Sequence, residues 1–150
     1  MIQLQPIGRI ITPFGSTADC PRNGRQIQPP PVCTAEVDEA YWDGLAGLEG
    51  FSHLILLYWM HAAKPMELQF TPPFDTESRG IFATRAPWRP NPIALSVVQF
   101  DGFDGPGRLR VRNLDCLSGT PLLDIKPYLV TTDSEPEASL GWLAPHATRT

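Results

Sequence analysis

The sequence predicts a mainly β protein: a small antiparallel barrel of six or seven strands with one or two short helices. Proline accounts for 17 of the 150 residues, roughly twice its usual share of about 5%, and long helices tolerate interior proline poorly. Short stretches rich in β-branched and aromatic residues alternate with turn-forming stretches along the chain. A sheet of this kind removes its exposed edges by closing into a barrel.

Three strands are expected in the first part of the chain, at residues 7–12, 32–37 and 51–61. The third is apolar on both faces and is expected to be central and buried. Residues 13–31 form a polar loop, and loops of this length in compact domains are usually functional. Residues 38–48 carry apolar side chains near helical spacing, with Asp38 as the expected cap of a short helix.

The remaining strands are expected at residues 80–84, 94–103, 107–113 and 121–130, and residues 64–79 are expected to form a loop. The turn Asp-Gly-Pro-Gly at 104–107 predicts a hairpin. We therefore expect a barrel domain over 1–133 and a tail over 134–150. In that tail Leu140, Trp142 and Leu143 are expected to dock against a partner surface.

Composition and missing motifs exclude several classes of protein. The net charge of −4 indicates no diffuse basic surface. No apolar run reaches the ~20 residues that span a bilayer, and the N-terminus lacks the features of a signal peptide, so a soluble, cytoplasmic protein is expected. The three cysteines form no CxxC pair, which argues against a disulfide framework and a structural zinc site. No dinucleotide, P-loop or nucleophile-elbow motif is present, and no metal is expected.

Arginine dominates the basic residues, with ten arginines and two lysines. Its planar fork of donors suits the recognition of phosphate, carboxylate and bases. In residues 107–113 three arginines alternate with apolar residues, which predicts a strand with one basic face and one core face. That face is either a strip for backbone phosphates or a surface on which arginines pair with acids. The three residues are Arg108, Arg110 and Arg112.

The passage FATRAPWRPNPIALS, residues 82–96, is stiff and cationic. Pro87, Pro90 and Pro92 fix the backbone and restrict the residue before each of them. Because proline has no N–H, we expect carbonyls without ladder partners, which could grip a polar ligand together with the arginine forks at little entropic cost. The alternative is a rigid crossover connection.

The segment LSGTPLLDIKPY, residues 117–128, begins with a turn and continues as a strand. Asp124, Lys126 and Tyr128 are expected on one strand face, because side chains alternate with period two. The alternative is a buried Asp–Lys pair that fixes strand register. His61, at the end of the central strand, is a further candidate for ligand contact, whereas His53 is expected to be a core histidine.

Two of these segments, TRAPWRPNPIALS (84–96) and SGTPLLDIKPY (118–128), resemble signature segments of the TsaA-like, or TrmO, family of S-adenosylmethionine-dependent methyltransferases. The match continues in IGRIITPF (7–14), CPRNG (20–24) and GLEGFSHLILLYWMH (47–61), and so extends from residue 7 to about 133. The resemblance implies a small β-barrel that binds S-adenosylmethionine and works as a homodimer, with cofactor sites near the subunit interface. The implied reaction is N6-methylation of N6-threonylcarbamoyladenosine beside the anticodon of tRNA.

Carried over by motif position, the resemblance implies cofactor contacts from Pro21, Arg22, Asn23, His61, Ala62, Arg85, Leu95, Ser118, Gly119 and Thr120. Asp124 is the candidate for orienting the acceptor or accepting its proton, with Lys126 and Tyr128 shaping the site. Arg89 and Trp88 are expected to contact phosphate or base, and Arg108, Arg110 and Arg112 the tRNA backbone.

The chain departs from the family pattern at three positions: Ser118 stands for Asp, Ala94 for Gly and Asn23 for a common Gln. Longer bacterial relatives also carry a C-terminal domain thought to engage tRNA, whereas this chain ends at Thr150. Two alternatives therefore stay open. One is methylation of another nucleoside or a small molecule, and the other is a non-enzymatic module that binds the cofactor and regulates.

Overall fold

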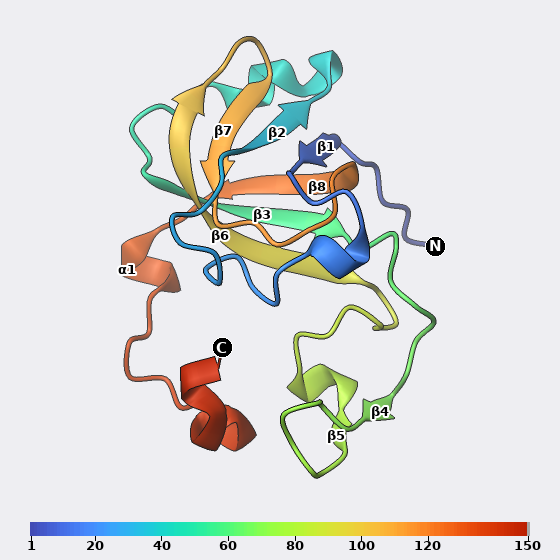
Figure 1. Ribbon diagram of the computed structural model, residues 1–150. Coiled ribbons are helices and arrows are strands. Elements are labelled where there is room, and N and C mark those ends of the chain that lie inside the picture. The colour runs from blue at the N-terminus through green and yellow to red at the C-terminus, as the bar shows by residue number, and fades with distance from the viewer. Residues whose placement is uncertain (150) are drawn as a thin grey trace.

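Six antiparallel strands close into a barrel in the order β1-β2-β7-β6-β3-β8 (Figure 1). The computed structural model describes residues 1–149, with the side chains of residues 1–146, so the last residue of the predicted tail lies outside it. A separate two-stranded sheet pairs β4 with β5. The predicted β-barrel is therefore confirmed. The strands are β1 (Gly8–Ile11), β2 (Cys33–Val37), β3 (His53–Trp59), β4 (Gln69–Phe70), β5 (Arg79–Gly80), β6 (Ile93–Phe103), β7 (Arg108–Arg112) and β8 (Thr120–Pro127).

The helical segments of the described chain are short: η1 (Thr17–Asp19), η2 (Glu39–Leu45), η3 (Ile81–Ala83), α1 (Val130–Asp133) and η4 (Gly141–Arg149). The predicted helix after Asp38 is a 3-10 helix, and the Asp38 side chain does not cap it. The Trp42 indole N–H instead donates to the Val37 carbonyl at 2.7 Å and holds this turn. No helix in the described residues has the length and apolar character needed to cross a membrane.

The predicted strand over 80–84 is wrong beyond its first residue. Gly80 belongs to β5, but the following residues form η3. The side chain of Ile81 is buried, and the Ile81 carbonyl accepts a hydrogen bond from the Thr84 backbone N–H at 3.1 Å. The Ile81 N–H still donates to the Leu68 carbonyl at 2.9 Å, and the chain turns into η3 directly after this contact.

The barrel interior is filled by alternate side chains of all six strands, as the period of two requires. β3 was expected to be buried on both faces, but only every second residue is buried, and Ile55 and Leu57 on the other face are half-buried. The closed barrel has one interior, so the second apolar face of β3 has no equivalent layer to cover it. The fully buried residues of the interior include Ile10, Ala35, Leu54, Leu56, Tyr58, Val98, Leu109, Val111 and Leu122.

A bulge in β8 changes the face on which its polar residues lie. The register with β3 shifts so that Leu57 pairs with Asp124 and Tyr58 pairs with Leu122. An extra residue of this kind interrupts side-chain alternation. Asp124 and Lys126 form an exposed ion pair at 2.9 Å, and Tyr128 lies beyond the end of the strand. The bulge precedes Asp124, so Asp124 and Lys126 lie on one strand face as expected, but Tyr128 is not part of the strand and the Asp–Lys pair is exposed rather than buried.

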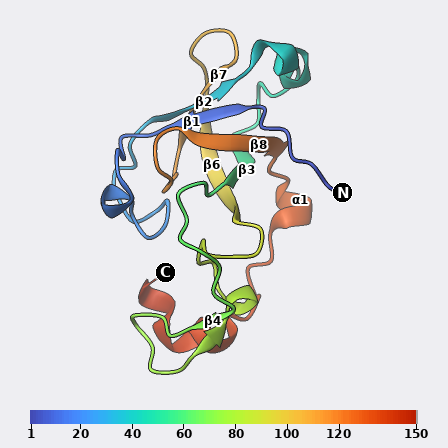
Figure 2. The same ribbon diagram turned by 90° about the vertical axis from the view of Figure 1, so that its right-hand side faces the viewer.

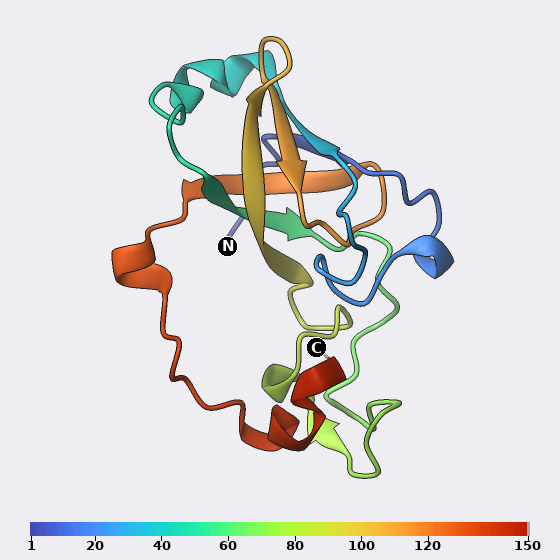
Figure 3. The ribbon, with the colours of Figure 1, turned by 60° about the vertical axis from the view of Figure 1, so that its left-hand side comes forward.

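Residues 60–92, here called the excursion, leave the barrel between β3 and β6 and form a lobe that carries β4, β5 and η3 (Figure 1). The chain after β8 passes through α1 and runs along the molecule to this lobe, where η4 lies beside β4 and β5 (Figures 2 and 3). The end of the chain thus returns to the excursion.

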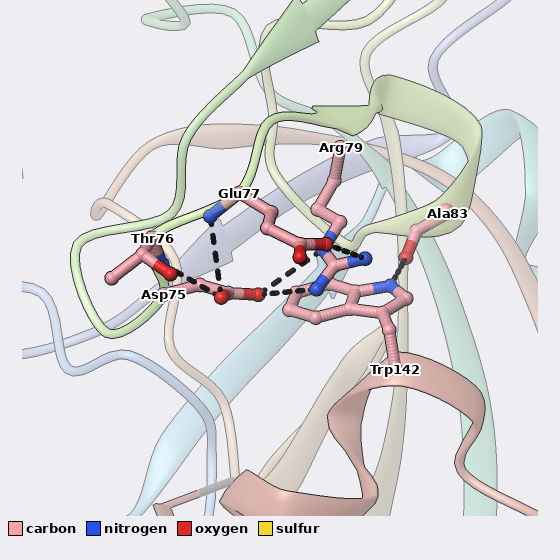
Figure 4. Close-up of polar contacts among 6 residues, drawn as sticks. All are labelled: Asp75, Thr76, Glu77, Arg79, Ala83 and Trp142. Atoms are coloured by element: carbon pink, nitrogen blue, oxygen red, sulfur yellow. Dashed lines mark hydrogen bonds and ion pairs between the residues drawn. The ribbon is translucent and has the colours of Figure 1, made fainter.

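Trp142 of η4 fastens this contact. Its indole N–H donates to the Ala83 carbonyl at 2.8 Å, and the Arg79 guanidinium lies 4.8 Å from the centre of its ring (Figure 4). Asp75 accepts a hydrogen bond from Arg79 at 2.8 Å and holds that guanidinium in place. The expected partner surface for Trp142 is therefore the chain's own excursion.

Candidate functional site

Two adjoining pockets lie where the excursion meets the barrel. Pocket 1 has a volume of about 710 Å³ and pocket 2 of about 300 Å³, both within the roughly 300–1,000 Å³ typical of ligand sites. They share a wall made by Arg22, Met60, Arg85, Pro87 and Asp115. Because the same five residues line both pockets, the two spaces adjoin.

All four segments singled out in the sequence contribute to these pockets. They are the loop between β1 and β2, the end of β3, the stiff passage leading into β6, and the connection between β7 and β8. The barrel places the ends of these strands side by side, so segments distant in sequence meet at one site. Eight of the ten residues assigned to the cofactor by resemblance line a pocket: Pro21, Arg22, Asn23, His61, Ala62, Arg85, Leu95 and Thr120.

The other two, Ser118 and Gly119, line neither pocket. Their backbone N–H groups donate to the carbonyls of Phe14 and Ile10 at 2.9 and 2.7 Å, and the Ser118 hydroxyl accepts from the Thr12 N–H at 3.1 Å. Gly119 has φ +91°, a conformation that glycine adopts without strain. This turn holds the β7–β8 connection against β1.

Hydrogen bonds brace the passage of residues 82–96, and the expectation that its carbonyls lack partners is wrong for three of them. The Arg89 guanidinium donates to the carbonyls of Thr84 and Ala86 at 2.7 and 3.2 Å, and the Met60 N–H donates to the Pro92 carbonyl at 2.7 Å. The prolines remove backbone N–H donors from the passage, and the Arg89 side chain and the Met60 backbone supply donors in their place. Arg89 therefore lines pocket 1 while its guanidinium holds the passage together.

Trp88 lies away from both pockets. Its ring packs edge-on against Phe70, with centroids 5.0 Å apart, and the Lys64 ammonium lies 4.2 Å from the ring centre. Its buried indole nitrogen has no hydrogen-bond partner in the described part of the chain. The face expected to stack on a base is thus occupied by the excursion itself.

The arginines divide into paired and unpaired groups. Of the nine whose side chains are described, Arg89 bonds to carbonyls and five pair with carboxylates: Arg9, Arg79, Arg108, Arg110 and Arg112. The basic strip on β7 is thus neutralised by Glu36, Asp104 and Asp101. The remaining three, Arg22, Arg25 and Arg85, have no carboxylate within ion-pair distance among the described residues, and all three line pocket 1.

A half-buried polar network that was not predicted from the sequence forms one side of pocket 1. The Tyr58 hydroxyl donates to Asp115 Oδ1 at 2.9 Å and lies 2.7 Å from the Ser96 hydroxyl, which therefore donates to it. Burial raises the pKa of the Asp115 carboxyl above its usual range, and the hydrogen bond from Tyr58 lowers it in part. A tyrosine within the apolar run of β3 was the available signal, because a buried phenol needs a polar partner.

Among the residues that the structure describes, Asp115 is the one carboxylate that lines both pockets. Asp124, Lys126 and Tyr128 line neither. Asp124 instead forms an exposed ion pair with Lys126. The Tyr128 ring lies edge-on to the His53 ring, with centroids 6.3 Å apart. Asp115, and not Asp124, is therefore the carboxylate that lies beside these pockets.

The cysteines differ in exposure. Cys33 and Cys116 are buried, and burial raises the pKa of their thiols to about 11 and about 12. Cys20 is half-buried and lines pocket 2. Burial also raises its pKa, with a further contribution from the charges of Asp115 and Asp19. Within the described residues no group of three or more histidine, cysteine or acidic side chains is arranged to hold a metal ion.

Comparison with known proteins gives a consistent family. Residues 9–134 match the family model described as the tRNA-methyltransferase O N-terminal domain. The chain is 45% identical over 125 residues to an S-adenosyl-L-methionine-binding protein of Archaeoglobus fulgidus, a match that covers 83% of the chain and 88% of the relative. The crystal structure of TrmO from Pseudomonas aeruginosa superposes with a TM-score of 0.76 and 36% identity.

The match does not extend over the whole of every relative. The P. aeruginosa comparison covers 95% of this chain but 62% of the solved one. A second A. fulgidus protein, named "Probable S-adenosyl-L-methionine-binding protein", is 41% identical over 142 residues, which are 95% of this chain and 38% of that protein. This chain therefore spans less than two thirds of the length of each of these two relatives.

Proposed function

The chain belongs to the tRNA-methyltransferase O N-terminal domain family, and from this premise we propose that it is an S-adenosylmethionine-dependent methyltransferase acting on a tRNA adenosine. The observation that carries the proposal is the set of residues shared by the two adjoining pockets, which includes the guanidinium groups of Arg22 and Arg85 and the half-buried carboxylate of Asp115. Methyl transfer requires a donor and an acceptor held in contact, and positioning of this kind supplies much of the rate enhancement.

The residues of pocket 2 fit the cofactor. Arg22 and Arg85 offer guanidinium forks to a carboxylate, and Asp115 offers a negative charge to an ammonium or sulfonium group. Met60, Pro87 and Leu117 supply apolar surface for an adenine ring. When bound, S-adenosylmethionine supplies an electrophilic methyl group. Six of the residues assigned by resemblance lie here, and Asn23 and Leu95, in pocket 1 alone, are proposed to face the acceptor.

Asp115 is proposed as the proton acceptor. A methylated exocyclic nitrogen must lose a proton, and a general base has to lie within hydrogen-bond reach of it. Tyr58 holds Asp115 through Oδ1, and Oδ2 is proposed to accept the proton. Because burial raises the pKa of Tyr58, the phenol stays protonated and keeps donating. Tyr58 thus holds the carboxylate in position, and Asp115 accepts the proton.

The acceptor is proposed to be N6-threonylcarbamoyladenosine of tRNA, methylated on N6. The unpaired arginines at pocket 1 support an anionic acceptor. The similarity to the tRNA-methyltransferase O N-terminal domain and to TrmO of P. aeruginosa supports tRNA as that acceptor. A cytoplasmic location is part of the proposal, because tRNA is its substrate. The homodimer implied by the resemblance remains part of the proposal, and it is supported by Ile93 and Leu95, which line pocket 1 with 40% and 46% of their surfaces exposed.

The test is transfer of radiolabelled methyl from S-adenosylmethionine to total tRNA prepared with or without the threonylcarbamoyl modification. The proposal predicts label in the modified tRNA alone. A second function, a non-enzymatic regulatory module, is favoured by relatives named only as binding proteins. It predicts calorimetric binding of the cofactor without label in any RNA or small-molecule pool.

A further inference from the structure

We infer that Arg25 is a specificity-determining residue, whose guanidinium recognises a carboxylate carried by the methyl acceptor in pocket 1. The inference rests on the proposed function, because it assigns one residue to one group of the proposed acceptor. Arg25 belongs to the loop between β1 and β2 and lines pocket 1 but not pocket 2. It therefore differs from Arg22 and Arg85, which stand in the wall between the two pockets.

The loop that carries Arg25 is held against the barrel. The Arg25 N–H donates to the Asn23 side-chain oxygen at 2.9 Å, and its carbonyl accepts from the Gln28 side-chain amide at 3.0 Å. Next to it, Gly24 contacts Asn113 so closely that a Cβ atom would lie 1.9 Å from the Asn113 carbonyl oxygen. Only glycine allows this approach, so the loop position is set by backbone contact with the end of β7.

The charge of Arg25 is available to a ligand. Its guanidinium forms no ion pair with the described acids, in contrast to the arginines of β7. The carboxylate that lines pocket 1, Asp115, is held by Tyr58. An exposed guanidinium at the rim of a pocket gains most from a planar carboxylate, which it binds with two parallel hydrogen bonds.

The cofactor and the acceptor need separate cations. The proposed cofactor has one carboxylate, which Arg22 and Arg85 of the shared wall are placed to bind. The threonylcarbamoyl group of the proposed acceptor carries a second carboxylate, and Arg89 is occupied by loop carbonyls. Arg25 is thus the arginine left for that group. A site built to bind a charged group rejects the analogue that lacks it.

The experiment compares two anticodon stem–loop oligonucleotides, one with the free threonyl carboxylate and one with its neutral methylamide. The wild-type protein is expected to prefer the free acid by about 10- to 100-fold in kcat/KM. Arg25→Gln is expected to lower kcat/KM for the free acid about tenfold or more, and to leave the methylamide unchanged. Oligonucleotide Kd values, measured with S-adenosylhomocysteine bound, are expected to change in the same way. Arg110→Gln, which removes an arginine paired with Asp104, is the matched control and is expected to keep the wild-type preference.

The outcomes separate this inference from the proposed function. If Arg25→Gln weakens both oligonucleotides by the same factor, Arg25 contacts the phosphate backbone and the inference is wrong, while the proposed function stands. If the wild-type protein methylates both oligonucleotides equally well, the inference is also wrong and the proposed function again stands. A wild-type protein that binds the cofactor but methylates neither oligonucleotide overturns the proposed function and the inference together.

Discussion

The hydroxyl of Tyr58 in β3 donates a hydrogen bond of 2.9 Å to Asp115 in the β7–β8 connection, 57 residues further along the chain. This contact joins the barrel interior to the wall between the two pockets. Tyr58 is 1% exposed, so the phenol is fixed by core packing and in turn fixes the carboxylate. Residues of the core and of the site are thus coupled through one hydrogen bond.

Tyr58→Phe is expected to shift the pH dependence of methyl transfer. The hydrogen bond from Tyr58 lowers the pKa of Asp115, so its loss raises that pKa. Because a base acts only when ionised, the acidic limb of the profile of kcat against pH should move to higher pH. A loss of about 1 kcal/mol in the free energy of unfolding should accompany it. An acidic limb at the wild-type position would show that Asp115 is not the titrating base.

Asp115→Asn is expected to alter stability in a pH-dependent way. Burial raises the pKa of folded Asp115 above the ordinary value of 3.8, so the folded state binds the proton more tightly than the unfolded state. Wild-type stability relative to the variant should therefore fall as the pH rises from below 3.8 through the raised folded pKa. Urea unfolding of both proteins across this interval measures the difference.

The paired acids supply the opposite control for that experiment. Hydrogen bonds from arginines lower the pKa of Glu36 and Asp101, so their contribution to stability is present above the unfolded pKa and is lost as the pH falls. Asp101→Asn should therefore cost stability at neutral pH and less in acid. If the Asp115→Asn curve has this same sign, the carboxyl of Asp115 is not held at a raised pKa.

Cys20 is expected to report occupancy of pocket 2. It lines that pocket and is half-buried, whereas Cys33 and Cys116 are buried with raised thiol pKa values. Iodoacetamide at alkaline pH should label Cys20 first, and added S-adenosylmethionine should slow the labelling. Peptide mass spectrometry identifies the modified residue, and Cys20→Ser is the control. Labelling of Cys20 at an unchanged rate with saturating cofactor would place the cofactor elsewhere.

Trp142→Ala is expected to loosen the excursion. The substitution removes the hydrogen bond to Ala83, the contact with Arg79 and the stacking on Phe74. Local contacts of this kind set the free energy of local opening, so backbone amides of residues 69–84 should exchange about tenfold faster or more, since each such contact is worth about 1 kcal/mol. Amides of β1 and β2 serve as the internal reference. Equal protection of the excursion in both proteins would show that η4 does not hold it.

The barrel could be predicted because its strands are local patterns. Leu109 and Val111 alternate with arginines in the sequence and face the core in the structure. The side of the barrel on which Asp124 lies could not be predicted, because it depends on the bulge between Leu122 and Asp124. That bulge arises from pairing with Tyr58 and Leu57 of β3, which lie far earlier in the chain. Similarly, the turn at Ile81 accompanies the burial of that side chain and a hydrogen bond from its N–H to the Leu68 carbonyl, and neither can be read from residues 80–84 alone.

The site shows the same division. The prolines of residues 84–92 predict a conformationally restricted segment. Which of its carbonyls accept hydrogen bonds depends on the positions of Arg89 and Met60, which the prolines do not determine. Pairing also decides which arginines are free: Arg108 and Arg25 look alike in sequence, yet Glu36 neutralises only the first. Asp115 was missed because its partner Tyr58 comes from a strand that reads as apolar core.

The measurement that tests the central claim most directly is methyl transfer to threonylcarbamoyl-modified tRNA by Asp115→Asn and Asp124→Asn, side by side, with cofactor binding followed by calorimetry. The account predicts that Asp115→Asn loses about 100-fold or more of the wild-type rate, while Asp124→Asn, on the exposed face with Lys126, stays within about threefold of it, the scale of an exposed ion pair. The reverse pattern, with Asp115→Asn active and Asp124→Asn inactive at unchanged cofactor affinity, would contradict the placement of the reaction between the two pockets.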